Sequence, residues 1–109
     1  MRTRFEALEL SLEIIPHLRK LVPAIRRHDR KLHEQMKEAG SSMPMNLAEG
    51  NRRRGKDRLF LWSVAAGSAD EVHTGLRAAA AWGYFPEHSA HEALELLDRL
   101  QAIIWKLMN

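Results

Sequence analysis

The chain has 109 residues, 45% of them hydrophobic and 28% charged, which is typical of one globular domain, so we expect a single domain over residues 1–109. It contains no cysteine, which excludes disulfide bonds, thiolate zinc sites and cysteine nucleophiles. No apolar run approaches the roughly 20 residues that span a bilayer. The first residues do not resemble a signal peptide, and we therefore expect a cytoplasmic location.

The net charge of +3 hides an uneven distribution along the chain. Residues 19–58 contain 12 lysines and arginines but only 5 aspartates and glutamates, a local net charge of +7, and the remaining residues carry −4. Such segregation produces a local electrostatic field that the total charge does not reveal. It is compatible with binding a polyanion, and equally with pairing against the acidic face of another subunit.

The first predicted helix runs from about Arg4 to Val22. Pro16 should kink it, because proline has no N–H to donate to the carbonyl of Leu12. Pro23 should then mark the turn into the next helix. The predicted inward stripe consists of Phe5, Leu8, Leu12, Ile15, Leu18 and Val22.

The second predicted helix runs from about Ala24 to Gly50 and should bend near Gly40 and Pro44 rather than end there. The segment from Gly50 to Gly55 should supply the stop and the turn, because glycine accepts the left-handed conformation common after a helix end. Its predicted inward residues are Leu32, Met36, Ala39, Met43 and Leu47.

The third predicted helix covers about Lys56 to Trp82 and should end at Gly83. The fourth should begin at Pro86, a favoured first helical residue. Residues at steps of three and four define one apolar stripe on each helix. These stripes are Trp62, Ala65, Ala69, Val72, Leu76 and Ala79 on the third helix, and Ala90, Ala93, Leu94, Leu97, Leu100, Ile104 and Leu107 on the fourth.

Four amphipathic helices joined by short connections predict an all-α fold, an antiparallel up-down four-helix bundle. The first and fourth helices carry more apolar residues than one stripe requires. A wide apolar arc usually contacts a second surface, so we expect self-association. The surplus residues are Leu10, Ile14, Leu96, Ile103, Trp105 and Met108.

The segment from Ser42 to Gly50, S-M-P-M-N-L-A-E-G, resembles the S-I-P-x-N-I-A-E-G signature of the 23S rRNA-intervening-sequence protein family. The segment from Gly67 to Glu71 is similar to the G-S-x-x-E of that family, and the resemblance covers essentially the whole chain. Met43 and Met45 replace the usual isoleucine and alanine, and methionine adapts well to such positions.

This resemblance implies a four-helix bundle assembled into a ring-shaped homopentamer. Many members of the family are encoded inside insertions in large-subunit rRNA genes, and the activity of the family is not established. A distant relative of the same fold, the accessory variability protein of diversity-generating retroelements, works with a reverse transcriptase and nucleic acid. A reverse transcriptase is therefore one conceivable protein partner.

The signature segment has physical properties that favour a structural role. We expect Asn46 and Glu49, which share a helix face, to contact Ser68 and Glu71 across the bundle and to hold the bent second helix in register. Gly67 and Ser68 are small enough to allow another backbone to approach. The residues assigned to this structural motif are Pro44, Asn46, Glu49, Gly50, Gly67, Ser68 and Glu71.

Two clusters of basic residues are candidate nucleic-acid contacts, because lysine and arginine bind phosphates without recognising bases. The long second helix should place them near opposite ends of the bundle. We expect the nearby Phe60 and Trp62 to fill the core rather than to stack on bases. The main cluster is Arg52, Arg53, Arg54, Lys56 and Arg58, and the second is Arg26, Arg27, Arg30 and Lys31.

Catalytic chemistry has little support in the sequence. A di-iron bundle needs two Glu-x-x-His motifs, and the chain has one acid-x-x-His pair, Asp70 and His73. His88 and His91 have metal-ligand spacing but lie where we expect an exposed first turn. We therefore expect no catalytic residue, metal or cofactor. The leading hypothesis is a non-enzymatic homo-oligomer that binds RNA, and the alternative is a scaffold that docks a partner enzyme without contacting nucleic acid.

Overall fold

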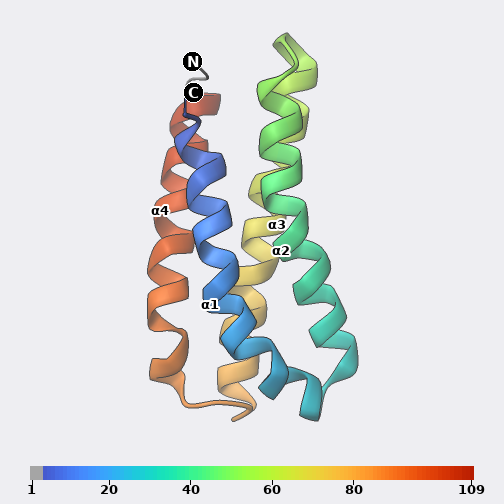
Figure 1. The fold of residues 1–109 in the computed structure, drawn as a ribbon, viewed down its shortest axis with the longest axis vertical. Coiled ribbons are helices and arrows are strands. Elements are labelled where there is room, and N and C mark those ends of the chain that lie inside the picture. Colours follow the sequence, from blue (N-terminus) through green and yellow to red (C-terminus); the bar gives the residue numbers. More distant parts are fainter. Residues whose placement is uncertain (1–3) are drawn as a thin grey trace.

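The computed structural model describes residues 4–109, and this part of the chain forms four α-helices and one short 3₁₀ helix, with no strand. Figure 1 shows that consecutive helices run in alternating directions along the long axis of a molecule measuring 42 × 25 × 22 Å. The predicted all-α four-helix bundle is confirmed. The elements are α1 (Glu6–His28), α2 (Arg30–Asn51), α3 (Gly55–Ala81), η1 (Glu87–Ala90) and α4 (His91–Met108).

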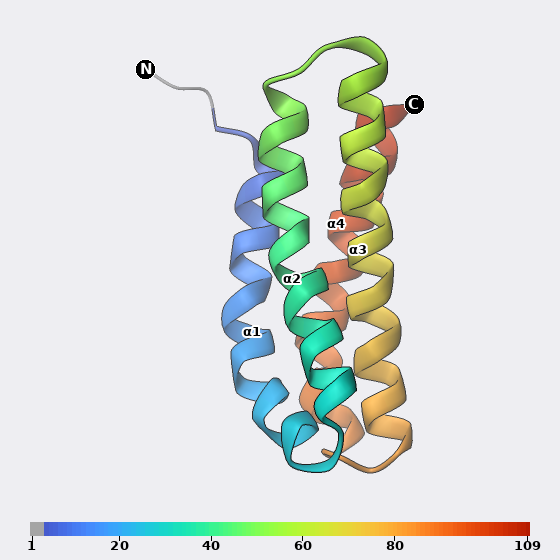
Figure 2. The same ribbon diagram turned by 90° about the vertical axis from the view of Figure 1, so that its right-hand side faces the viewer.

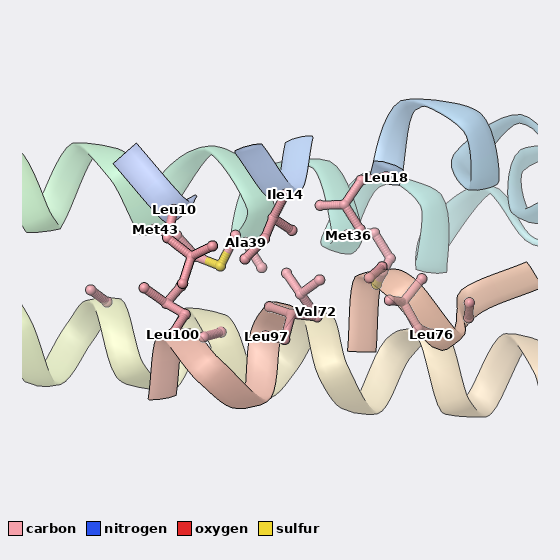
Figure 3. Close-up of a cluster of buried hydrophobic side chains, with 14 of the residues drawn as sticks. Leu10, Ile14, Leu18, Met36, Ala39, Met43, Val72, Leu76, Leu97 and Leu100 are labelled. Atoms are coloured by element: carbon pink, nitrogen blue, oxygen red, sulfur yellow. The ribbon is translucent and has the colours of Figure 1, made fainter. Parts of the chain in front are cut away.

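The hydrophobic core lies along the bundle axis and receives side chains from all four helices (Figure 3). All six residues of the predicted stripe on α3 are buried, so that prediction is confirmed. Within residues 4–109, no helix is both long enough and apolar enough to cross a membrane. The core residues labelled in Figure 3 are Leu10, Ile14, Leu18, Met36, Ala39, Met43, Val72, Leu76, Leu97 and Leu100.

The boundary between the first two helices was predicted wrongly. α1 continues through both Pro16 and Pro23 to His28. Both prolines are exposed, so water can satisfy the carbonyl groups that they leave without an N–H donor. The turn falls instead at Asp29, whose side-chain Oδ1 accepts a hydrogen bond from the Leu32 N–H at 2.9 Å and caps α2.

The inward face of α1 was predicted only in part, because of the predicted stripe only Leu18 is buried. Leu12, placed on the core stripe, is 45% exposed, whereas Leu10 and Ile14, assigned to a second surface, are buried. The polar Ser11 interrupts the apolar pattern of the buried stripe, so the sequence did not reveal it. Burial of this serine is possible because its hydroxyl donates a hydrogen bond to the Leu8 carbonyl at 2.7 Å. The face that α1 buries consists of Ala7, Leu10, Ser11, Ile14, Leu18, Leu21 and Ile25.

α2 runs without interruption through Gly40 and Pro44, and in Figure 1 its first half leans away from the line of its second half. Its predicted inward residues are buried, apart from the half-buried Leu32. The stop and turn predicted between Gly50 and Gly55 are confirmed, because α2 ends at Asn51 and α3 begins at Gly55, while Gly50 itself lies inside α2. The positive φ, 55°, belongs to Gly55 at the start of α3.

α3 ends at Ala81, and the predicted stop signal, Gly83, follows with a φ of 82°. The N–H groups of Gly83 and Tyr84 donate to the carbonyls of Ala80 and Ala79, both at 2.9 Å, in a Schellman motif. The start of the fourth helix differs from the prediction, because Pro86 is extended and precedes η1. Leu107, placed on the inward stripe, is exposed near the end of α4.

Candidate nucleic-acid interface

Ser42 is the centre of a polar network between α2 and α3. The Ser68 hydroxyl donates to Ser42 Oγ at 2.8 Å, and the Asn46 amide donates both to Ser42 Oγ and to the Ser42 carbonyl, each at 2.9 Å. Asn46 and Ser68 are therefore linked through a third residue rather than directly. Ser42 belongs to the signature segment, but its role in this network is not predictable from the sequence, because a serine within a helix carries no signal for an interhelical bond.

The two glutamates of the expected motif do not take part in this network. Glu71 is exposed, and Glu49 Oε1 accepts hydrogen bonds from Arg53 Nε at 3.0 Å and Arg53 Nη2 at 2.7 Å on the surface. The bond to Arg53 holds the pKa of Glu49 below its usual value and raises the pKa of Arg53. The expected contact of Glu49 with Glu71 was thus wrong, while the link between Asn46 and Ser68 exists.

The glycines of the motif have different environments. Gly50 is buried against the indole ring of Trp62, where a Cβ would come within 2.6 Å of a ring atom. Trp62 Nε1 also donates to the Leu47 carbonyl at 3.3 Å, so a small residue at position 50 allows this side chain to lie across the end of α2. Gly67 is exposed, and beyond its own stretch of helix no described atom lies within 4 Å of the position that a Cβ would take. The close backbone approach expected at Gly67 is not made by any other part of residues 4–109.

The turn between α2 and α3 carries five basic residues, which we call the turn cluster: Arg52, Arg53, Arg54, Lys56 and Arg58. Arg58 donates from Nε to the Gly50 carbonyl at 3.1 Å and from Nη2 to the Asn51 carbonyl at 2.9 Å, and its guanidinium lies 5.1 Å from the centre of the Trp62 ring. It therefore caps α2.

Arg53 pairs with Glu49 and Arg58 binds the carbonyls at the end of α2, which leaves three members of the turn cluster without a partner in the described part of the chain. Arg52, Arg54 and Lys56 form no ion pair with any residue that the structure describes. Phe60, one helical turn after Lys56, is 66% exposed, so the expectation that it fills the core was wrong. The same expectation is confirmed for Trp62, which is 5% exposed.

The second group of basic residues lies at the opposite end of the bundle, where α1 passes into α2 (Figure 2). All four are exposed, and the ion pairs found over residues 4–109 include none of them. An open cavity of about 510 Å³ lies at this position, lined by Pro23, Arg26, Arg27, Arg30 and His33. The members of this group, which we call the corner cluster, are Arg26, Arg27, Arg30 and Lys31.

Two histidines lie next to acidic residues of α4, and His88 and His91 are exposed. His73 Nε2 lies 3.1 Å from Asp98 Oδ1, and His17 Nδ1 lies 3.9 Å from Glu92 Oε2. Over the described residues, no three His, Asp or Glu side chains are grouped so that they could hold a metal ion.

The fold and its two charged ends define a basic four-helix-bundle protein. The chain belongs to the 23S rRNA-intervening sequence protein family, whose family model matches residues 3–106. The resemblance found in the sequence is thereby confirmed. No curated protein matches the chain.

Among solved structures, the chain is similar to a protein with unknown function from the S23 ribosomal protein family of Bacteroides thetaiotaomicron. The two superpose with a TM-score of 0.84 over 94% of this chain and 98% of the other, at 14% sequence identity. This likeness concerns the fold alone.

Proposed function

We propose that this protein is a non-enzymatic, homo-oligomeric four-helix bundle that binds RNA or another nucleic acid electrostatically. The observation that supports the proposal is the set of exposed cations at the two bundle ends that form no ion pair with another residue of the described part of the chain. Lysine and arginine side chains of this kind bind phosphates and displace the counterions condensed on a nucleic acid. The set consists of Arg52, Arg54 and Lys56 from the turn cluster and Arg26, Arg27, Arg30 and Lys31 from the corner cluster.

Within the turn cluster, the hydrogen bonds determine which residues contribute most. Arg58 is occupied by the carbonyls at the end of α2, and the charge of Arg53 is compensated by Glu49. We therefore assign phosphate binding at this end to Arg52, Arg54 and Lys56. The exposed ring of Phe60 can add stacking on an unpaired base.

Replacing both Arg52 and Arg54 by alanine should weaken the binding of single-stranded RNA and make it less dependent on salt. Each lost phosphate contact should reduce the slope of log affinity against log salt concentration by about 0.7, or about 1.4 for the double variant. Fluorescence anisotropy titrations of a labelled RNA at several salt concentrations measure this slope.

The matched control is the double variant R77A/R99A, which removes the same charge from exposed positions on α3 and α4. Its slope should stay close to that of the unchanged protein. If both variants behave alike, the turn cluster is not the interface. If the unchanged protein has no salt-dependent affinity for RNA, the electrostatic proposal fails, and the alternative of a scaffold that docks a partner enzyme, such as a reverse transcriptase, gains support.

We also propose that the bundle assembles into a homopentamer, which would repeat both charged clusters around a ring. Large apolar side chains on the surface of the single chain support self-association, and they include Leu12, Trp82 and Trp105. Light scattering on the purified protein should give five times the mass of one chain. A monomer over a wide concentration range would contradict this proposal.

A further inference from the structure

The corner between α1 and α2 is built on a single connecting residue, Asp29. The Asp29 N–H donates to the Ile25 carbonyl at 2.7 Å, and the Asp29 carbonyl accepts from the His33 N–H at 3.1 Å. Its side chain caps α2 at the Leu32 N–H. These bonds fix the end of α1 against the start of α2, so the side chains of the two adjoining turns have a defined relation to one another.

The cavity at this corner is lined by cationic side chains from both helices. Arg26 and Arg27 come from the last turns of α1, and Arg30 and His33 come from the start of α2. Pro23 adds an apolar part to the wall. The space has a volume of about 510 Å³ and is open to solvent, so a phosphate group can reach its cationic lining from the surface.

The neighbouring polar groups do not neutralise this cavity. The Asp29 carboxylate accepts the capping hydrogen bond from Leu32, and over residues 4–109 it forms no ion pair with the arginines that line the cavity. His28 has its Nδ1 3.0 Å from the Ala24 carbonyl, its ring stacks on Tyr84 with the centroids 4.8 Å apart, and it does not line the cavity. The three arginines consequently keep their N–H donors available for a ligand.

The two ends of the bundle therefore differ in kind. The turn cluster has two of its five side chains engaged within the chain, and its free cations surround an exposed turn. The corner cluster has three arginines around one concave space, and none of them forms an ion pair within residues 4–109. A compact, highly charged anion is better matched by the corner, although the longer run of cations in the sequence had favoured the turn.

We infer that the corner cavity binds the terminal phosphomonoester of a nucleic acid. The assignment to the end of a nucleic acid rests on the proposed function, that the protein binds nucleic acid. A phosphomonoester carries nearly two negative charges at neutral pH and three unesterified oxygens, whereas an internal phosphodiester carries one charge. Planar guanidinium groups bind such an oxygen set in bidentate fashion. Arg26, Arg27 and Arg30 hold the phosphate, and Pro23 contacts the attached nucleoside.

The test compares two short single-stranded RNAs of identical sequence, labelled at the 3′ end and carrying either a 5′-phosphate or a 5′-hydroxyl group. The unchanged protein should bind the phosphorylated RNA about tenfold more tightly, the effect of one or two additional charge-assisted hydrogen bonds. The variant R26A/R30A should lose this preference. The matched variant R52A/R54A, with the same change in charge, should weaken binding of both RNAs and keep the preference.

A third variant, R26K/R30K, separates recognition of the phosphate from simple attraction. It keeps the charge and should keep the affinity for the 5′-hydroxyl RNA, but it should reduce the preference because lysine cannot form the bidentate contact. Circular dichroism verifies that each variant remains helical. An unreduced preference in R26A/R30A would place the phosphate elsewhere and overturn the inference.

Equal binding of the two RNAs by the unchanged protein would also overturn the inference. If that equal binding depended on salt, the proposed function would still stand. The converse result is also informative. If a nucleoside 5′-monophosphate binds the unchanged protein but not R26A/R30A, and the unchanged protein does not bind RNA, phosphate binding in the cavity is supported and the proposed function is refuted. Competition with that nucleotide and with inorganic phosphate distinguishes a polymer end from a free phosphate. If the free nucleotide binds as tightly as the phosphorylated RNA, the assignment to a polymer end is wrong.

Discussion

Replacing Trp62 by alanine should lower the free energy of unfolding by about 3–5 kcal/mol, the range found for removal of large buried aromatic side chains. The indole ring is 5% exposed, packs on Gly50, lies 5.7 Å from the Phe5 ring between centroids, and donates a hydrogen bond to the Leu47 carbonyl. The variant should lose all these contacts at once. Urea unfolding followed by circular dichroism measures the change, because it does not depend on tryptophan fluorescence.

Phe60→Ala is the internal control for this experiment. Phe60 lies two residues before Trp62 on the same helix but is 66% exposed, so its removal should change the unfolding free energy by no more than about 0.5 kcal/mol. Similar losses from the two substitutions would show that the face of α3 has been assigned wrongly.

Ile14→Ala should cost about 2–5 kcal/mol of stability, whereas Leu12→Ala should cost less than about 1 kcal/mol. Ile14 is fully buried among the four helices and Leu12 is 45% exposed, although both are large aliphatic residues on α1. Thermal or urea unfolding of the two variants under identical conditions measures the difference.

The unfolding of both α1 variants should be followed at two protein concentrations. If Leu12 lies in a contact between subunits, the loss in Leu12→Ala will depend on concentration, while the loss in Ile14→Ala will persist in the dilute sample. A larger loss for Leu12→Ala at low concentration would contradict the buried face found for α1.

The sequence predicted the inward face of α3 but not that of α1, for a physical reason. α3 has one apolar stripe, so its periodicity allows one solution. α1 has apolar residues on two interleaved stripes. The buried stripe contains the polar Ser11, so the stripe through Leu12 and Ile15 looked more apolar in the sequence. A buried serine that bonds to its own helix is indistinguishable in sequence from an exposed one.

Part of the candidate site was also predictable. The position of the two basic clusters at opposite ends follows from helix length, and the pairing of Glu49 with Arg53 could have been anticipated from their spacing of four. Phe60 and Trp62, two residues apart on a helix, point in opposed directions and could not both have filled the core. The capping by Arg58 depends on how the turn folds back, and local spacing does not encode that.

The placement of unlike clusters at the two ends of one bundle has a consequence for a cyclic assembly. Rotation about a single axis carries each end of a subunit onto the same end of its neighbour. A ring with its bundles aligned along that axis would therefore have two chemically different rims. One rim would display the exposed cationic turn of every subunit, and the other the arginine-lined cavity of every subunit. Such a particle would be polar, and a nucleic acid lying across it would meet a different surface on each side.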